Sequence, residues 1–396
     1  MTSPDQRVAG SFRDPNGFLF WREGTLYRQI NRSYLPHYER LMQSGLYDRL
    51  VKAGQLIPHE VAQIAPARPE QAALVIRPEP VPFLSYPYEW SFGQLRDAAL
   101  TTLSILKKAL EAGMVLKDAS AYNIQFHHGR PMLIDTLSFE TLQEGSPWVA
   151  YRQFCQHFLA PLALMAHRDV RLGQLLRVYI DGLPLDLASR LLPLHTWLNP
   201  GLTAHLHIHA GAQKRFAGEV VSRRAMSQLA LQGLIESLQS TVRALRWNPQ
   251  GTAWADYYDS TNYTRQAFEA KEAVVAAWAS RLQPRLTWDL GANTGVFSRA
   301  AARASGLVVS WDIDPAAVEK NYRQVRQAKE KNILPLVIDL TNPSPAVQTS
   351  SLYALGELGP AAAPAVPYVE ALARGASASS GVALQVLARV DPTPAR

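Results

Sequence analysis

The pattern of apolar and polar positions divides the first part of the chain into short strands and amphipathic helices. Residues 17–30 contain two aromatic or β-branched runs separated by Glu23 and Gly24, which predicts a β-hairpin. Residues 34–53 repeat their apolar positions at helical spacing and predict a helix. A short strand at 73–77 lies inside a Pro-rich patch, and a second helix follows at 95–112, with Leu100, Leu103, Leu106 and Leu110 on one face. These elements predict an N-terminal α+β domain.

The second half of the chain changes from a helical pattern to an alternation of strands and helices. Residues 148–245 are mostly helical in pattern, and their last part, 214–245, predicts one long helix. Strand-like runs then occur at 286–290, 307–311 and 333–339, with helical patterns between them at 296–304 and 315–330. A strand-helix-strand-helix-strand order is typical of a parallel, doubly wound sheet. The chain therefore predicts a multi-domain α/β protein.

After Pro345 the composition shifts to alanine, glycine, serine and proline. Residues 353–373 resemble one HEAT-like helical repeat, and residues 382–390 have the pattern of the next helix. Helical repeats need about three copies to bury a continuous core, so we expect this helical tail to be only marginally stable alone. The predicted domains are therefore residues 1–245, residues 246–347 and the tail at 348–396.

Composition describes an ordinary soluble globular protein, with 47% hydrophobic and 18% charged residues. The single cysteine, Cys155, excludes an internal disulfide framework and favours a reducing compartment, and its surroundings favour packing over catalysis. No apolar run approaches the roughly 20 residues that span a bilayer, and the polar N-terminus lacks a signal-peptide core. We therefore expect a cytoplasmic protein without a membrane partner. The formal charge of +7 permits nucleic acid or an anionic sugar as a partner, but no dense basic run supports either.

A glycine-rich turn follows the strand at 286–290 and leads directly into the next helix. Its sequence begins Asp289-Leu-Gly-Ala-Asn-Thr-Gly, so the glycines stand at 291 and 295. Glycines in such a turn let the backbone approach a ligand closely. Asp312 follows the next strand, about 20 residues later, where dinucleotide-binding folds carry an acidic residue that accepts hydrogen bonds from ribose. The spacing D-x-G-x-x-x-G differs from the G-x-G-x-x-G of nicotinamide sites.

This turn, the Asp-Ile-Asp-Pro at 312–315 and the Val-Ile-Asp-Leu at 337–340 resemble, in order, three motifs of class I S-adenosylmethionine-dependent methyltransferases. The resemblance implies a transferase that methylates an acceptor. The sequence does not identify this acceptor, a catalytic base or an oligomeric state. It implies that Asp312 contacts the ribose and that Asp339 lies near the adenine amino group. The residues that it assigns to S-adenosyl-L-methionine are Asp289, Gly291, Asn293, Gly295, Asp312 and Asp339.

The resemblance covers about residues 254–345 and then stops. Upstream, residues 254–263 resemble the aromatic segment that often covers the cofactor, with Tyr258 or Tyr263 as the contact. Downstream, residues 341–345 have the composition of a turn, and the alanine-rich tail stands where a fourth strand is expected. A partial Rossmann-like sheet leaves a strand edge exposed. We therefore expect a truncated or recombined chain, joined near Val347, that binds the cofactor weakly and turns over poorly.

A second constellation, in the N-terminal domain, is similar to a protein kinase catalytic loop. Asp118 and Asn123 have the D-x-x-x-x-N spacing, and Asp135 follows where a kinase has its metal-binding aspartate. The pattern departs from the family at Leu116 and Lys117, which replace histidine and arginine, and Asp135 is not followed by Phe-Gly. Two alternatives to a methyltransferase therefore remain open: a degenerate kinase-like phosphoryl-transfer or nucleotide-binding protein, and a non-catalytic binding protein.

The alternating histidines His205, His207 and His209 would share one face of a strand and could approach a metal there. No cysteine or acidic ligand lies nearby in the sequence, and histidines that pack on a surface or a helix are far commoner. We therefore expect no metal site.

Overall fold

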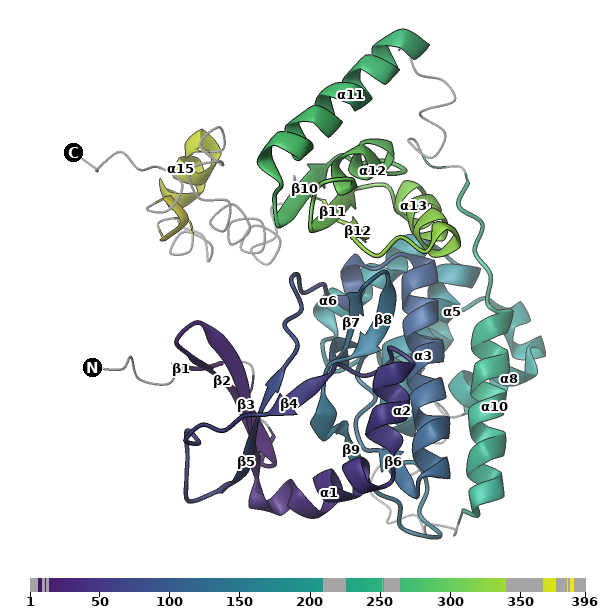
Figure 1. Cartoon of the computed structure of the whole chain (residues 1–396). Coiled ribbons are helices and arrows are strands. Elements are labelled where there is room, and N and C mark those ends of the chain that lie inside the picture. Colours follow the sequence, from purple (N-terminus) through teal and green to yellow (C-terminus); the bar gives the residue numbers. More distant parts are fainter. Residues whose placement is uncertain are drawn as a thin grey trace. The chain divides into compact units, whose positions relative to one another are not determined.

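The computed structural model describes residues 6–8, 11, 14–208, 226–250, 252, 264–339, 366–374, 383 and 385–387. The chain is a mixed α/β protein with several small sheets. It divides into two compact units, Met1–Val337 and Ile338–Arg396. Figure 1 labels most of the helices and strands of the first unit.

An antiparallel sheet of five strands opens the first unit, in the order β1-β2-β3-β5-β4. Its hairpin joins β2 (Gly17–Arg22) to β3 (Thr25–Asn31), and the two loop residues Glu23 and Gly24 both have positive φ, 51° and 73°. A two-residue turn of this kind matches the twist of the flanking strands. The hairpin predicted at 17–30 is therefore confirmed. The remaining strands are β1 (Gln6–Arg7), β4 (His59–Val61) and β5 (Ala72–Pro78), which contains the strand predicted at 73–77.

The helix predicted at 34–53 is two helices, α1 (Leu35–Gln43) and α2 (Leu46–Lys52). The chain breaks at Gly45, whose φ of 71° ends one helix and precedes the next. The prediction of one continuous helix was therefore wrong, because a glycine in the left-handed region stops a helix that the apolar spacing would continue. Leu41, Leu46 and Leu50 are fully buried.

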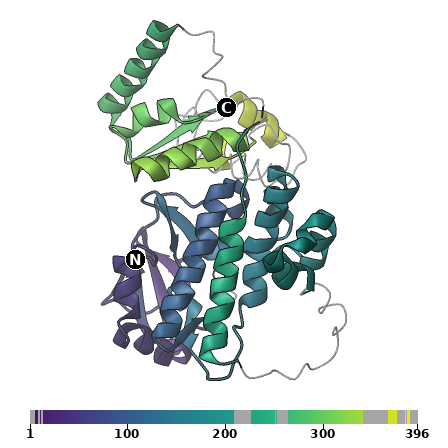
Figure 2. The ribbon, with the colours of Figure 1, turned by 90° about the vertical axis from the view of Figure 1, so that its right-hand side faces the viewer.

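The long helix α3 (Phe92–Glu111) forms the centre of the N-terminal part and confirms the helix predicted at 95–112. It begins earlier than predicted because Ser91 and Gln94 form a capping box. The Ser91 hydroxyl accepts from the Gln94 N–H at 3.3 Å, and the Gln94 side chain accepts from the Ser91 N–H at 3.0 Å. Helix α10 (Gln228–Ala244) lies beside α3 in both Figure 1 and Figure 2.

Two short antiparallel strand pairs, which the sequence did not reveal, follow α3. Strand β6 (Met114–Leu116) pairs with β9 (Phe139–Thr141), and β7 (Ile124–His127) pairs with β8 (Arg130–Leu133). The β7–β8 turn consists of His128 and Gly129, with φ of 51° and 72°. Asp118, Asn123 and Asp135 lie in the connections of these strands.

Within residues 148–245, the described residues are mostly helical, as predicted. The prediction of one long helix at 214–245 was wrong about where the helix begins. Helix α10 begins at Gln228, because Ser227 caps it by accepting from the Ala230 N–H at 3.2 Å. Residues 209–225 lie outside the described residues. The other helical elements are α4 (Tyr151–Phe154), η5 (Cys155–Leu159), α5 (Ala160–His167), η6 (Val170–Gln174), α6 (Leu175–Val178), α7 (Leu185–Leu191), η7 (Leu194–Leu198), α8 (Pro200–Leu202) and η8 (Thr203–His207).

A parallel sheet of three strands follows, in the order β10-β11-β12. The strands β10 (Leu286–Leu290), β11 (Leu307–Asp312) and β12 (Ile333–Val337) confirm the three strand predictions, although β12 ends two residues early. Helices α12 (Val296–Ala302) and α13 (Pro315–Ala328) connect them, and α11 (Arg265–Leu282) precedes them. Pro335 stands inside β12, which is an edge strand, where its missing N–H costs no ladder bond.

Helix α13 packs against the start of α3. The Gly93 N–H donates to the Glu319 carboxylate at 2.7 Å, and the Tyr322 hydroxyl donates to Asp97 at 2.7 Å. Arg326 pairs with the same Asp97 carboxylate at 3.2 Å. A side chain at Gly93 would meet the Glu319 oxygens at 2.8 Å, so glycine is required for this close approach.

In the second unit the structure describes helix α15 (Val366–Arg374), which overlaps the repeat predicted at 353–373. The rest of that repeat, the turn at 341–345 and the proposed joint near Val347 lie outside the described residues. Of residues 382–390, the four that are described are helical.

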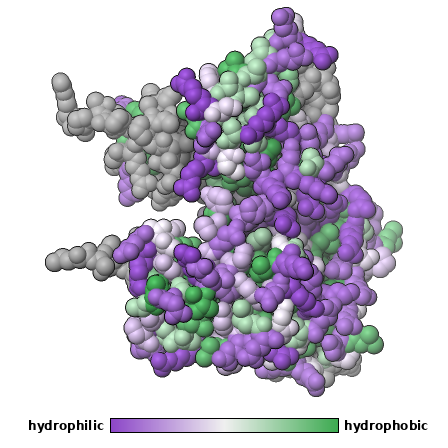
Figure 3. All heavy atoms as spheres, viewed as in Figure 1, coloured by the Kyte–Doolittle hydropathy of each residue, from purple (hydrophilic) through white to green (hydrophobic). Residues whose placement is uncertain are grey.

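Hydrophilic side chains cover much of the face seen in Figure 3. None of the helices in the described parts of the chain is both long and apolar enough to cross a membrane.

Candidate functional site

The glycine-rich turn lies at the carboxyl end of β10, between that strand and α12. The N–H groups of Gly291 and Ala292 both donate to the Trp311 carbonyl, each at 2.9 Å. Gly291, Asn293 and Gly295 all have positive φ, of 75°, 50° and 79°. The turn is therefore held against the end of β11 in a conformation that glycine adopts without strain and that asparagine tolerates better than most residues.

The two glycines of the turn have different surroundings. A Cβ added at Gly291 would have no described heavy atom of another element within 4 Å, so this position borders open space. A Cβ added at Gly295 would lie 2.5 Å from the Asn321 amide nitrogen on α13. Gly295 is therefore required by helix packing, whereas Gly291 leaves room for a ligand to approach the backbone.

Asp312, the last residue of β11, is fixed beside this turn by two backbone donors. One carboxylate oxygen accepts from the Asn293 N–H at 2.7 Å, and the other accepts from the Asp314 N–H at 2.9 Å. The side chain is buried, and burial raises its pKa, although the two amide donors act in the opposite direction. Asp314 caps α13 through its contact with the Ala316 N–H at 2.8 Å. Of the two aspartates in the 312–315 motif, Asp312 therefore faces the turn and Asp314 caps a helix.

Asp289 belongs to a buried polar network below the turn. The Ser298 hydroxyl donates to its carboxylate at 2.6 Å, and Ser298 also contacts the Ser310 hydroxyl at 2.7 Å. Burial raises the pKa of Asp289, opposed by the Ser298 hydrogen bond and by the charge of Lys271, while the neighbouring Asp312 raises it further. Asp289 therefore supports the turn from the side of α12 and faces a second carboxylate.

Arg299 on α12 holds the turn by hydrogen bonds. The sequence did not indicate this residue. Its guanidinium donates to the carbonyls of Thr294 and Gly295 at 2.9 and 3.0 Å and to the Asn321 side chain at 3.0 Å. It also pairs with Glu330 at 2.9 Å. Nothing in the spacing of the motif indicates this arginine, because its partners come from the turn, from α13 and from the loop after α13.

The structure brings together Asp289, Gly291, Asn293, Gly295 and Asp312, five of the six residues assigned to the cofactor. The sixth, Asp339, is half-buried and follows β12 in the second unit. Tyr258 and Tyr263 lie outside the described residues.

The kinase-like constellation has a different arrangement. The Asp135 carboxylate pairs with Arg28 on β3 at 2.5 Å and also accepts from the Leu137 N–H at 3.0 Å and the Ser138 hydroxyl at 2.8 Å. The Ile134 N–H donates to the Asn123 carbonyl at 2.9 Å, which brings Asn123 next to the residue before Asp135.

Asp118 accepts from the Ser120 N–H at 2.9 Å and lies near His157. Burial lowers the pKa of His157 to about 4, with the charge of Asp118 opposing the shift, so this imidazole is neutral at pH 7. The side-chain nitrogen of Asn123 is buried without a hydrogen-bond partner among the described residues.

The histidines considered as metal ligands lie in the helical segment η8 and not in a strand. His205 lies between the Tyr151 hydroxyl at 2.8 Å and the Ser237 hydroxyl at 2.9 Å. His207 contacts the hydroxyls of Ser189 at 2.8 Å and Thr196 at 3.0 Å. The two rings therefore have separate hydroxyl partners, and His209 lies outside the described residues.

Cys155 is fully buried. Burial raises the pKa of its thiol to about 12, so the reactive thiolate is absent at neutral pH and the side chain serves in packing.

The comparisons with known proteins give a curated relative and a distant structural likeness. No family model matches the chain. Among solved structures, vaccinia related kinase 3 aligns over 61% of this chain and 87% of its own, with 10% identity and a TM-score of 0.30. Among curated proteins, nodulation protein NoeA of Rhizobium meliloti (strain 1021) is 32% identical over 355 residues, which are 86% of this chain and 73% of the relative. The chain belongs to the family of nodulation protein NoeA.

Proposed function

We propose that the chain binds S-adenosyl-L-methionine at the turn between β10 and α12 and acts as a methyltransferase. The observation that carries the proposal is the pairing of Gly291, which borders open space, with the fixed carboxylate of Asp312 at the end of the neighbouring strand. A ligand that needs close backbone approach and a hydrogen-bond acceptor for hydroxyl groups fits this arrangement. The name of the relative connects that protein with nodulation and states no reaction, so the chemistry proposed here rests on the residues.

In this proposal the residues of the turn have separate tasks. Asp312 accepts from the ribose hydroxyls, for which it keeps lone pairs beyond those used by its two backbone donors. Gly291 lets the cofactor reach the backbone. Asp289, Asn293 and Gly295 keep the turn in shape through contacts with α12, β11 and α13. The resemblance also assigns Asp339, which belongs to the second unit, to the adenine.

The bound cofactor supplies a methyl group activated on a sulfonium, so the protein's part is to orient the two partners and exclude water. We assign no general base to the acceptor. Among the described residues no strand pairs with the outer edge of β10, where Leu290 is 52% exposed. We therefore propose cofactor binding as the primary property and expect slow turnover.

We extend the proposal to the fold and the compartment. The strands β10 to β12 with α12 and α13 would be the first part of a Rossmann-like methyltransferase sheet, and the preceding region would have a kinase-like fold. The chain would encounter its methyl acceptor in the cytoplasm.

The test is titration calorimetry of the full chain with S-adenosyl-L-methionine, with Asp312→Ala as the site variant. Asp186→Ala on α7 is the matched control, because it removes an aspartate of another element, one that pairs with Arg190 at 3.0 Å. We expect binding to the wild type and the control and a loss of at least about tenfold in the Asp312→Ala variant, the scale of one charge-assisted hydrogen bond. No binding by a folded wild-type chain, or equal binding by both variants, would contradict the proposal.

A second candidate is nucleotide binding at the kinase-like constellation. The observation in its favour is the buried Asn123 amide without a described partner, next to the segment that leads to Asp135. Arg28 argues against this candidate, because it pairs with the Asp135 carboxylate, and a kinase uses the corresponding carboxylate to bind magnesium. Binding of magnesium ATP that is lost in Asp135→Ala would favour this candidate. A folded chain with affinity for neither cofactor would favour a non-catalytic binding protein.

A further inference from the structure

Glu79, His127 and His128 come together at the edge of the N-terminal part, outside both constellations described above. Glu79 directly follows β5, His127 ends β7, and His128 is the first residue of the β7–β8 turn. One Glu79 oxygen lies 2.8 Å from His127 Nε2 and 3.6 Å from His128 Nε2. One ligand atom of each residue lies within 4.8 Å of the other two.

The backbone of the hairpin holds the two imidazoles side by side. His128 has a φ of 51°, and its ring centroid lies 3.8 Å from that of His127. The following residue, Gly129, has no room for a Cβ because the Glu330 carbonyl stands there. The turn is thus fixed by the loop after α13, and the ring positions do not depend on a free surface segment.

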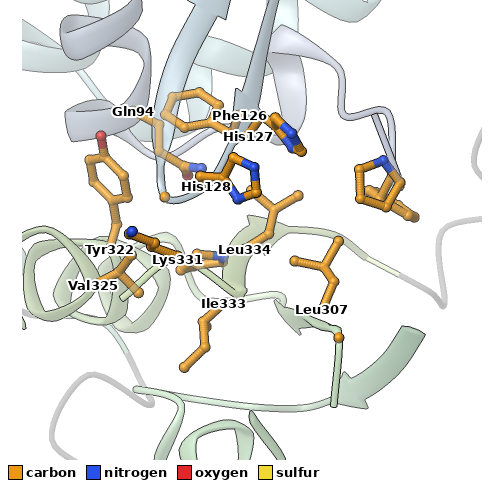
Figure 4. Close-up of a pocket in the computed structure, with 15 residues that line it drawn as sticks. Gln94, Phe126, His127, His128, Leu307, Tyr322, Val325, Lys331, Ile333 and Leu334 are labelled. Atoms are coloured by element: carbon orange, nitrogen blue, oxygen red, sulfur yellow. The ribbon is translucent and has the colours of Figure 1, made fainter. Parts of the chain in front are cut away.

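A cavity of about 70 Å³ adjoins the two histidines. His127 and His128 lie next to each other in Figure 4, among lining residues that include Lys331 and Leu334. The volume accommodates a few water molecules. A metal ion held by the three side chains would therefore have space for a further ligand.

We propose that Glu79, His127 and His128 bind a divalent transition-metal ion, with Zn²⁺ as the best match, and leave one coordination position open. Two ligand atoms at about 2.0–2.1 Å from a tetrahedral zinc lie roughly 3.3 Å apart. The two contacts of Glu79, at 2.8 and 3.6 Å, lie on either side of this value, and all three ligand atoms lie within 4.8 Å of one another, so the side chains would draw closer around a bound ion. Two imidazoles and one carboxylate are also the ligands of many catalytic zinc sites.

The charges around the three residues favour a moderate affinity. Glu79 is the one anionic side chain among the three proposed ligands. Two cationic side chains lie close by, since Arg130 is two residues after His128 and Lys331 lines the cavity. These positive charges oppose the binding of a cation, so we expect weaker binding than at a site with more carboxylates.

A metal at this position would join two segments that the sequence keeps apart. Glu79 begins the connection from β5 to α3, and the histidines belong to the β7–β8 hairpin. The contact of His127 with Glu79 joins them at 2.8 Å, and farther along the connection Ser85 exchanges hydrogen bonds with the Gln125 side chain on β7 at 2.8 and 2.9 Å. The bound ion would add a further link between the connection and the hairpin, and it would stabilise the folded chain by an amount that grows with the logarithm of its concentration.

The test uses full-length protein without a histidine tag, stripped with a chelator and titrated with ZnCl₂ by calorimetry. The site variants are Glu79→Ala and His128→Ala, which change exposed side chains and should leave the fold intact. The matched control is His167→Ala, because His167 pairs with His195 at 5.5 Å between ring centroids. Circular dichroism verifies the fold of each variant.

We expect one zinc ion per chain and an affinity that falls at least about tenfold in each site variant but not in the control. A visible absorption spectrum typical of tetrahedral Co²⁺, present in the wild type and lost in His128→Ala, would support the same ligands. No binding by the folded wild type would overturn the proposal, as would equal affinity in the site variants and the control. Neither result bears on the binding of S-adenosyl-L-methionine, which is titrated separately.

Discussion

Asp135 follows β8 and Asp312 ends β11, and both are largely buried, but their charges are stabilised in different ways. Asp135 pairs with the guanidinium of Arg28, whereas Asp312 accepts from the backbone N–H groups of Asn293 and Asp314. A carboxylate held by amides keeps its negative charge available to a ligand. A carboxylate neutralised by arginine offers less to a magnesium ion, since the cation already occupies the position.

The comparison teaches that residue spacing alone does not distinguish a binding carboxylate from a structural one. Both aspartates matched a family motif at the right distance from their neighbours. What separates them is Arg28, which lies on β3 and far from Asp135 in the sequence.

The largest effect is expected for Arg28→Ala. The side chains of Arg28 and Asp135 are only 11% and 18% exposed, so the variant leaves a buried carboxylate without its cation. We expect a loss of about 3–5 kcal/mol in the free energy of unfolding, measured by urea denaturation. The matched control is Arg265→Ala, whose pair with Glu269 is exposed and should contribute less than about 0.5 kcal/mol. If Mg²⁺ restored the stability of Arg28→Ala, Asp135 would be a metal ligand after all.

The next largest effect is expected for Gly295→Ala. The new methyl group would lie 2.5 Å from the Asn321 amide, and the residue would keep a φ of 79°. Left-handed strain of about 1–2 kcal/mol and overpacking of about 1–3 kcal/mol together predict a loss of roughly 3 kcal/mol. Thermal or urea unfolding measures it. Stability equal to wild type would show that α13 moves freely relative to the turn, and the contact with Asn321 would then not explain the glycine.

Much of the secondary structure could be predicted from the sequence because its signals are local. The hairpin has a two-residue turn at Glu23 and Gly24, and the strand at 286–290 has the predicted bounds. The helix start at Ser227 and the break at Gly45 were missed, although serine and glycine are common at those positions. The pairs β6–β9 and β7–β8 were missed because strands of three or four residues are too short for an alternating pattern.

The sites were predictable only as far as their residues are neighbours in the sequence. The turn from Gly291 to Gly295 and its link to Asp312 follow from the strand-helix order. Arg299, which holds the turn, pairs with Glu330, 31 residues away. The contact of His127 with Glu79 spans 48 residues. Such contacts depend on how the elements pack, which no spacing rule in one sequence encodes.

Glu89 is a third kind of buried carboxylate. Its burial predicts that the free energy of unfolding depends on pH. Glu89 is 5% exposed and accepts from the Tyr86 N–H at 2.8 Å. Burial raises its pKa from 4.5 to about 7, while that hydrogen bond and the charge of Arg177 act in the opposite direction. A raised carboxyl pKa means that the folded state binds more protons than the unfolded state, so stability is lost as pH rises from about 4.5 to about 7.

Glu89→Gln should therefore be more stable than wild type at pH 8, by about 2 kcal/mol after a weaker hydrogen bond is allowed for. The difference should vanish at pH 4, where Glu89 is protonated in both states. Urea denaturation of both proteins from pH 4 to pH 8 measures it, and groups common to both cancel in the difference. A difference that does not change with pH would mean that Glu89 is not buried as described.

The smallest change in stability is expected for Gly291→Ala, and it addresses the methyltransferase proposal most directly. No described heavy atom of another element lies within 4 Å of the added methyl group, so only the strain of a φ of 75° remains, about 1 kcal/mol. The same methyl group enters the space proposed for the cofactor, so S-adenosyl-L-methionine should bind at least about tenfold more weakly, a loss of about 1.4 kcal/mol. Gly233→Ala on α10 is the control, because its Cβ also meets nothing within 4 Å and its φ is helical. If Gly291→Ala bound the cofactor as tightly as wild type, the open space beside the turn would not be the binding site, and Asp312 would lose its proposed partner.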